Sequence, residues 1–64
     1  MTIQFKSGDY VTRITPYLKE RGIVKRIADD KSTFVVYHCG GDWKHYNDYT
    51  AARTYNNELV RGWK

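Results

Sequence analysis

Cysteine and proline are almost absent from this sequence, which contains one residue of each. Small secreted domains are commonly held together by several disulfides, and the single cysteine, Cys39, cannot form one within the chain. We therefore expect a fold without covalent cross-links, in a reducing compartment such as the cytoplasm. The sequence also lacks a long apolar run and an apolar N-terminal stretch, so it predicts neither a membrane span nor a signal peptide.

A chain of 64 residues has little room for a large core. A domain of this size buries only about 60% of the surface that its unfolded chain exposes. We expect a single domain, residues 1–64, with little stability to spare for a strained, water-excluding active site. The sequence contains no phosphate-binding loop of the Walker type and no dinucleotide-binding fingerprint. It therefore predicts a protein that is not an enzyme and needs no cofactor.

Acidic residues are fewer than basic ones, with seven Asp and Glu against eleven Lys and Arg and a net charge of +4. This excess permits attraction to nucleic acid or to an acidic protein surface. The aromatic content is more unusual, because six Tyr, two Trp and two Phe exceed what one small core can enclose. Some of these rings are expected at the surface, where Tyr and Trp are favoured in binding sites.

Short segments rich in β-branched residues and bounded by turn residues indicate β-strands. The expected strands are residues 10–14, 23–28, 33–39, 42–46 and 58–63, with residues 47–57 irregular. Pro16 ends the first strand, and Gly40-Gly41 predicts a tight hairpin between the third and the fourth. Five strands at this spacing predict an all-β fold, and closure into a barrel would protect the edges of the sheet.

The C-terminal half permits a second interpretation, an α+β fold in which a three-stranded sheet precedes a C-terminal helix. Asp42 could cap this helix, Gly62 could end it, and rings recur near helical spacing from Trp43 to Tyr55. However, a strict spacing of three residues drifts around an α-helix, and the segment is rich in Asn and Thr, which are mediocre helix formers. The all-β fold is therefore favoured.

The expected core takes apolar residues from the N-terminal segment and from most strands. Its members are Phe5, Val11, Ile14, Val24, Ile27, Val35 or Val36, and Leu59. Gly8 and Gly22 are expected to serve the backbone, Gly8 within the turn signal Ser7-Gly8-Asp9. Trp63 fits either a packed or a projecting position.

Three patterns resemble small SH3-like barrels, namely Phe5-x-x-Gly8-Asp9-x-Val11, Gly22-Ile23-Val24-x-x-Ile27 and Val35-Val36-Tyr37. The second is similar to the KOW-type pattern of ribosome- and transcription-associated domains, and residues 46–59 look like the end of the E-type barrel of photosystem I. The resemblance implies a five-stranded SH3-like barrel whose loops bind protein or nucleic acid, with a long loop and a short turn before the last strand. Residues 15–21 do not match the peptide-binding set of signalling SH3 domains, so binding of proline-rich peptides is not expected.

One cluster contains side chains of the types that ligate metals: His38, Cys39, Asp42 and His45. Its spacing matches no standard pair, and a structural zinc site typically has four thiolate or imidazole ligands. A three-residue hairpin loop would place Cys39 and His45 on one sheet face, whereas a two-residue loop would place them on opposite faces. Cys39 and His45 could also be drawn as a nucleophile and a base, but such catalysis needs an orienting group and an oxyanion site. We expect no metal site and no catalytic residue here.

Cations occur on the first two expected strands and again in the second half of the chain. They include Arg13, Lys19, Arg21, Lys25, Arg26, Lys44, Arg53, Arg61 and Lys64. Cations that share a face with aromatic rings can follow the phosphates of single-stranded nucleic acid while the rings stack on bases, for about 1–3 kcal/mol per base. The residues predicted for this function are Tyr17, Lys25, Arg26 and Lys44, although interspersed acids dilute the field.

The favoured functional prediction is a protein-docking surface. The segment from Trp43 to Tyr55 is too polar for a core and too aromatic for a linker, and rings beside an arginine are typical anchors of protein interfaces. The predicted partner-binding residues are Trp43, Tyr46, Tyr49 and Arg53. In the alternative interpretation, Trp43, Tyr46 and Tyr55 fill one end of the barrel. We expect a module that docks on, and regulates or inhibits, a larger assembly, as bacterial and phage accessory proteins do, either as a monomer or as an edge-paired homodimer.

Overall fold

The computed structural model describes residues 5–64, and residues 1–4 of the expected domain lie outside the described part. The described strands are β1 (Tyr10–Ile14), β2 (Lys19–Ile27), β3 (Ser32–Val36), β4 (Ala52–Tyr55) and β5 (Leu59–Arg61). Within residues 5–64 the helical segments are two 3₁₀ helices, η1 (Trp43–Asp48) and η2 (Asn56–Glu58). The strands form one antiparallel sheet in the order β4-β3-β2-β1-β5, so the all-β prediction is confirmed. No helix among residues 5–64 is long and apolar enough to cross a membrane.

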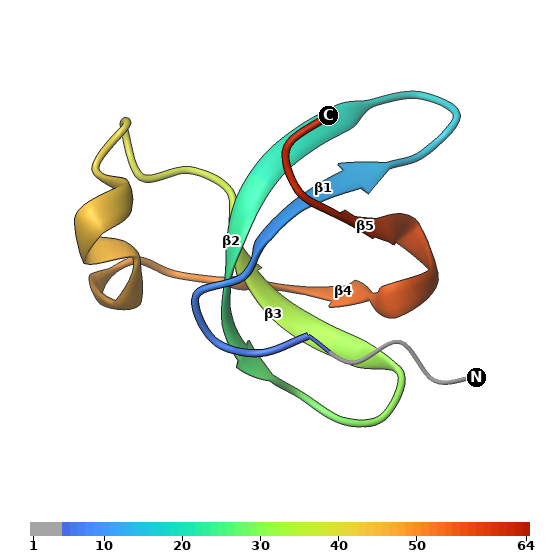
Figure 1. Ribbon diagram of the computed structural model, residues 1–64, viewed down its shortest axis with the longest axis horizontal. Helices are drawn as coiled ribbons and strands as arrows, with labels where there is room; N and C mark the ends of the chain where they lie inside the picture. Colours follow the sequence, from blue (N-terminus) through green and yellow to red (C-terminus); the bar gives the residue numbers. More distant parts are fainter. Residues whose placement is uncertain (1–4) are drawn as a thin grey trace.

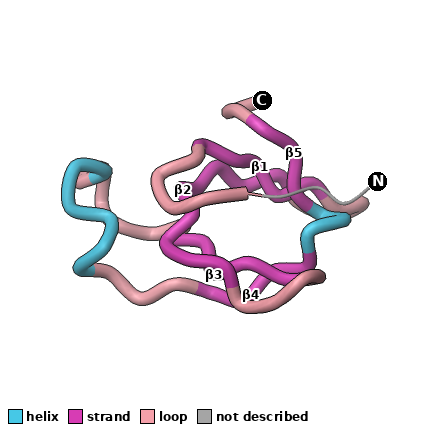
Figure 2. The backbone as a smooth tube through the Cα atoms, turned by 60° about the horizontal axis from the view of Figure 1, so that its bottom comes forward, coloured by secondary structure: helices cyan, strands magenta, loops and turns pink. Residues whose placement is uncertain are grey.

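The long strand β2 connects two halves of a curled sheet. It pairs with β1 through residues 19–23 and with β3 through residues 23–27, and a bulge at Lys25 interrupts the second pairing. Such bulges bend a strand and increase its twist. Figure 2 shows β1 and β5 on one side of the molecule and β3 and β4 on the other. Short η2 joins β4 to β5, but these edge strands are not paired in the described residues, so the sheet is open and a closed barrel is not confirmed.

The core lies between the two halves of this sheet. Its members are Phe5, Val11, Val24, Val35 and Leu59, and half-buried Tyr37 packs against them. These five core positions were predicted, and Gly22 has the expected backbone role. A Cβ atom on Gly22 would lie 2.6 Å from Cγ1 of Val35 and 2.8 Å from the carbonyl oxygen of Val36. Only glycine allows β2 and β3 to approach this closely without a shift.

Two predicted core residues are at the surface. Ile14 is 42% exposed and Ile27 is 45% exposed. Because strand side chains alternate between faces, the buried position of Val11 directs Ile14, three residues later, to the opposite face. Ile27 is the last residue of β2, beyond the bulge at Lys25, and lies past the end of the core.

The core extends further than predicted on the other face of the sheet. Ile23 and Val36, on this face, are buried, and Cys39, beyond the end of β3, is buried as well. Ile23 and Val36 are paired across β2 and β3, so buried residues lie on both faces of the middle of the sheet.

The connection between β3 and β4 differs most from the prediction. Strand β3 ends at Val36, and residues 42–46 are not a return strand. The Gly40-Gly41 turn does form, with the Asp42 amide donating to the Cys39 carbonyl oxygen at 2.9 Å, but it leads into η1 (Figure 1, left). The fourth strand is β4, within the segment predicted to be irregular. The alternative C-terminal helix is also wrong, because residues 52–61 form two short strands on either side of η2.

The period of the aromatic residues explains η1. A 3₁₀ helix has three residues per turn, so side chains three positions apart lie above one another. Trp43, Tyr46 and Tyr49 have this spacing, and each is partly buried, whereas the residues between them are exposed. The regular three-residue spacing that fitted an α-helix poorly therefore fits this 3₁₀ segment, which is kinked at His45.

Candidate functional site

The two faces of the sheet differ in charge. The face opposite the core, here called the outer face, is defined by the strand register, because directly paired residues point to the same side. Its strand residues are Tyr10, Thr12, Ile14, Lys19, Arg21, Ile23, Arg26, Ser32, Phe34, Val36, Arg53, Tyr55 and Val60. Every charged residue in this set is a cation. The single acidic residue of the described strands, Glu20, lies on the inner face.

Three outer-face residues form a row across three neighbouring strands. Arg26 on β2 pairs with Phe34 on β3, and Phe34 pairs with Arg53 on β4. Here this set is called the Arg–Phe–Arg row. The guanidinium carbon of Arg26 lies 4.7 Å from the centre of the Phe34 ring, a cation–π contact. The row thus has a partly exposed ring between two exposed cations.

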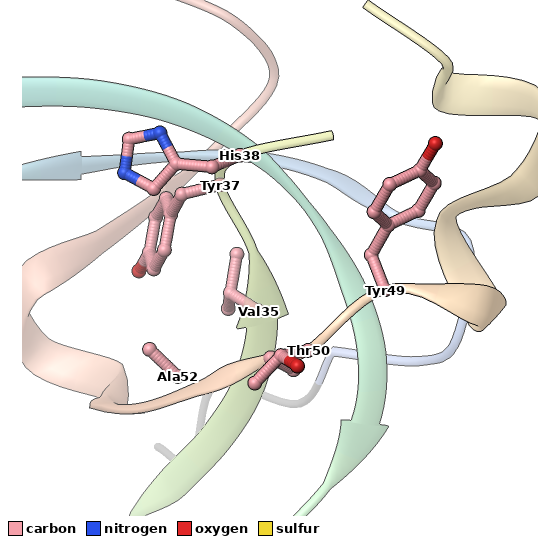
Figure 3. A pocket seen from close by; sticks show the side chains of 7 residues that line it. Val35, Tyr37, His38, Tyr49, Thr50 and Ala52 are labelled. Atoms are coloured by element: carbon pink, nitrogen blue, oxygen red, sulfur yellow. The ribbon is translucent and has the colours of Figure 1, made fainter. Parts of the chain in front are cut away.

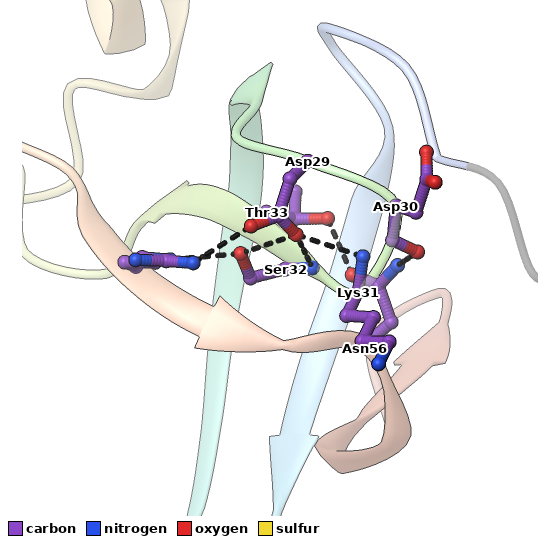
Figure 4. A network of polar contacts seen from close by, with 7 residues as sticks. Asp29, Asp30, Lys31, Ser32, Thr33 and Asn56 are labelled. Atoms are coloured by element: carbon purple, nitrogen blue, oxygen red, sulfur yellow. Dashed lines mark hydrogen bonds and ion pairs between the residues drawn. The ribbon is translucent and has the colours of Figure 1, made fainter.

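Arg53 is oriented by the turn between β2 and β3. Its Nε donates to Oγ of Ser32 at 2.8 Å, and its Nη2 contacts Oδ2 of Asp29 at 2.7 Å. The other oxygen of Asp29 accepts hydrogen bonds from the Lys31 and Ser32 amides and from the Ser32 hydroxyl (Figure 4). These bonds lower the pKa of Asp29 from its usual 3.8, and the bond from the Lys31 amide contributes most. The carboxylate is therefore ionised at neutral pH and forms an ion pair with Arg53.

A shallow depression of about 290 Å³ lies beside the row. It is lined by Lys25, Arg26, Phe34, Thr50 and Ala51. The Lys25 ammonium donates to the carbonyl oxygen of Tyr49 at 2.8 Å, which fixes the chain just before Thr50. The depression is open to solvent, so its shape suits a segment of an extended polymer better than an enclosed small molecule.

A second open depression, of about 380 Å³, shares Thr50 and Ala51 with the first. Figure 3 shows Tyr37 and His38 at one end of it and Tyr49 and Thr50 at the other. Its lining is mostly apolar and carries no Lys or Arg. It therefore lacks the cationic groups that distinguish the depression beside the Arg–Phe–Arg row.

A second group of rings lies on the outer face near β1. Tyr10 stacks on Trp63 with ring centres 4.9 Å apart, and Trp43 tilts against Trp63 at 5.2 Å. The indole N–H of Trp63 donates to the carbonyl oxygen of Gly22 at 3.0 Å. Trp63 is therefore packed, although 37% of its surface remains exposed, and Tyr10 is 56% exposed.

The predicted partner-binding rings all make contacts within the chain. Trp43 packs on Trp63, and the Tyr46 hydroxyl lies 3.1 Å from Oγ of Ser7. The Tyr49 hydroxyl donates to Oδ2 of Asp42 at 2.9 Å. The fourth predicted residue, Arg53, lies on β4 in the Arg–Phe–Arg row. The structure therefore brings the three rings to one segment and places Arg53 with other residues.

The residues predicted to bind nucleic acid are also separated. Tyr17 lies at the turn between β1 and β2 and is 95% exposed, whereas Lys44 is exposed on η1. Lys25 bonds to the backbone next to the first depression, and Arg26 belongs to the row. Phe34 was not predicted as a site residue. Only the cross-strand register, which pairs Phe34 with Arg26 and Arg53, identifies it, and this register depends on the bulge at Lys25.

The cluster of metal-ligating residue types is divided. Nε2 of His38 lies 3.3 Å from Oε2 of Glu20, and Nδ1 of His45 lies 2.8 Å from Oδ1 of Asp42. Cys39 is buried. Among residues 5–64, no group of three or more His, Cys, Asp or Glu side chains could hold a metal ion.

The contact between Asp42 and His45 shifts the pKa values of both groups. The hydrogen bond raises the pKa of His45 above its usual 6.5 and, together with the Tyr49 hydroxyl, lowers the pKa of Asp42 below 3.8. The hydrogen bond to Asp42 also raises the pKa of Tyr49. Since all three residues belong to η1 or flank it, this network holds the 3₁₀ segment in its conformation.

Comparisons with known proteins identify no relative. No protein-family model matches the sequence, and neither a curated protein nor a solved structure matches it. The choice of site therefore depends on the chain's own residues. The strongest candidate is the Arg–Phe–Arg row with the cationic depression beside it.

Proposed function

We propose that this chain is a non-catalytic module that binds single-stranded nucleic acid across the outer face of its sheet. The Arg–Phe–Arg row is the observation that carries the proposal. Proteins that bind single strands combine cations that follow the backbone with rings on which bases stack. In the row, Phe34 would stack on a base while Arg26 and Arg53 contact the phosphates on either side.

The distribution of ion pairs supports this assignment. Within residues 5–64, five of the seven acids contact an arginine or a histidine: Asp9, Glu20, Asp29, Asp42 and Glu58. Among the cations of the same residues, only Arg13, Arg53 and Arg61 contact a carboxylate. Of the outer-face cations, Lys19, Arg21 and Arg26 contact no carboxylate within residues 5–64, so this face keeps a cationic surface although Asp29 pairs with Arg53.

We also propose an SH3-like architecture for the chain. The long connection from residue 37 to residue 51 and the short η2 turn before β5 correspond to the long loop and short turn that the resemblance implies. The two edge strands, β4 and β5, follow one another in the chain, and the sheet is curled. Both features are compatible with such a barrel. Fold and function remain separate proposals, because one small fold serves many functions.

Docking of a protein on Trp43, Tyr46 and Tyr49 has less support. Each of these rings already has a contact within the chain, and each is only partly exposed. A partner could therefore contact only part of each ring, whereas the row presents a ring between two exposed cations.

The test is binding of a fluorescent oligothymidine, followed by anisotropy over a range of salt concentrations. Phe34→Leu keeps an apolar residue but removes the stacking ring, and we expect a loss of about 1–3 kcal/mol in binding free energy. Arg26→Gln should reduce the dependence of log K on log salt by about 0.7, as expected for one lost phosphate contact.

Lys6→Gln is the matched control, because Lys6 is an exposed cation outside the strands. It removes the same charge without touching the row. Undetectable binding of the natural chain at low salt would contradict the proposal, as would equal effects of Arg26→Gln and Lys6→Gln.

A further inference from the structure

The turn between β1 and β2 presents an exposed apolar tip. Tyr17 is 95% exposed, and Ile14 and Leu18 beside it are about 40% exposed. Pro16 is exposed as well. Isolated exposed apolar residues are ordinary on protein surfaces, but a contiguous group indicates an interaction site.

The tip is held in one conformation by Thr15. The Thr15 amide donates to the Leu18 carbonyl oxygen at 2.9 Å, and Oγ1 of Thr15 accepts from the amides of Tyr17 at 3.3 Å and Leu18 at 3.1 Å. Pro16 has no amide hydrogen. Every amide hydrogen of residues 15–18 is therefore bonded within the turn.

This arrangement lowers the free energy needed to bury the tip. Removing an unbonded amide from water is costly, and here no donor of the turn would be left without an acceptor. A preorganised loop also loses little conformational entropy when it binds. The tip can therefore enter an apolar site without rearranging its backbone.

Cations lie directly behind the tip. Lys19 and Arg21 are exposed on the outer face of β2, and neither contacts a carboxylate within residues 5–64. Glu20 between them points to the inner face, where it contacts His38. The apolar tip thus has a cationic margin on one side.

We propose that this tip docks into an apolar pocket rimmed by carboxylates on a partner protein. Tyr17 is the anchor, since tyrosine is among the residues that dominate interface energetics, and Ile14 and Leu18 pack around it. Lys19 and Arg21 contact the carboxylates at the rim. A nucleic acid fits the tip less well, because two of its three large side chains are aliphatic and offer no stacking surface. A bilayer would gain little from one tyrosine and two half-exposed aliphatic residues.

The site is separate from the Arg–Phe–Arg row and does not depend on the nucleic-acid proposal. It would attach the module to a larger assembly and leave the row free.

The experiment places a photoreactive phenylalanine analogue at position 17 of the full chain in a lysate of the organism that encodes it. Mass spectrometry then locates the cross-linked residues. We expect cross-links to one protein, at a site with apolar residues and Asp or Glu around them. The same analogue at position 55 is the control, since Tyr55 is an exposed tyrosine at the other end of the sheet.

The identified partner is then titrated with purified variants. Tyr17→Ser should weaken binding by about 30-fold, in the range of an interface anchor. Charge reversal by Lys19→Glu should weaken it too, and Tyr55→Ser should not. Thermal unfolding of each variant establishes that the fold is retained.

Two results would overturn the proposal. One is cross-linking from position 17 that is no more selective than from position 55. The other is binding to vesicles of phosphatidylserine and phosphatidylcholine that Tyr17→Ser abolishes, which would assign the tip to a membrane surface.

Discussion

The inner and outer faces of the sheet come from the same five strands, yet they differ in exposure and in charge. On the inner face, Val11, Val24 and Val35 are fully buried, and their size and shape are explained by packing. On the outer face, Arg26, Phe34 and Arg53 remain accessible, and packing does not explain why a ring lies between two cations. Packing accounts for the inner-face residues, whereas the proposed binding of nucleic acid would account for the Arg–Phe–Arg row on the outer face.

The comparison is tested most severely at two adjacent residues of β5. Leu59 is in the core, and Val60 points outward. We expect Leu59→Ala to lower the free energy of unfolding by about 2–5 kcal/mol, enough to unfold much of a marginal domain. Val60→Ala should change it by less than about 0.5 kcal/mol. Urea denaturation followed by circular dichroism measures both, and equal effects would remove the distinction between the faces.

Gly22 tests how tightly the inner face is closed. Because an added Cβ atom would lie within 3 Å of both Val35 and Val36, Gly22→Ala should cost about 1–3 kcal/mol of stability. The thermal midpoint measures the loss. An unchanged midpoint would mean that β2 and β3 separate easily and that the close approach is not required.

A substitution of Asp29 tests whether this carboxylate competes with the phosphates of nucleic acid for Arg53. Asp29→Asn keeps the shape of the side chain but removes the charge beside Arg53, so we expect oligonucleotide affinity to rise about two- to fivefold. Weaker or unchanged binding would show that Arg53 must be held by a carboxylate to function.

The same substitution should alter the acid stability of the protein. The folded pKa of Asp29 is below its usual 3.8, so its contribution is complete above pH 3.8 and is lost as the pH falls through the lower folded value. Acid unfolding curves of Asp29→Asn should lack this component. A curve identical to that of the natural chain would contradict the hydrogen-bond assignment.

The prediction with the smallest expected effect concerns η1. Because the pKa of His45 is raised above 6.5, its contact with Asp42 contributes stability that is complete below pH 6.5 and lost as the pH rises through the folded value. An NMR titration of the His45 ring should show the raised midpoint. In Asp42→Asn the midpoint should return towards 6.5, and a midpoint that stays raised would require another cause.

The inner face was largely predictable from the sequence. Alternation and turn residues located β1 correctly and identified most of the core, because a period of two along a strand needs no knowledge of its neighbours. The exposure of Ile14 shows the limit of this approach, because an apolar residue enters the core only if it points to the inner face, and Ile14 points to the outer one. The position of η1 was not predicted, because a spacing of three residues between Trp43 and Tyr49 fits neither an α-helix nor a strand and is typical only of the less common 3₁₀ helix.

The outer face was not predictable in the same way. Arg26, Phe34 and Arg53 are separated by at least eight positions in the sequence, and they meet only through the pairing of β2, β3 and β4. That pairing includes the bulge at Lys25, which shifts Arg26 onto the outer face. Individual cations can be named from the sequence, but a row of three depends on register, and register depends on the whole sheet.

Binding to the outer face is tested most directly by NMR. Amide and side-chain spectra are recorded while unlabelled oligothymidine of about ten nucleotides, within the site sizes of single-strand-binding folds, is added. We predict that the largest shifts occur at Arg26, Phe34 and Arg53 and beside them at Thr50 and Ala51, with the inner-face valines unaffected. Shifts centred on residues 43–49, or no shifts at low salt, would contradict the account.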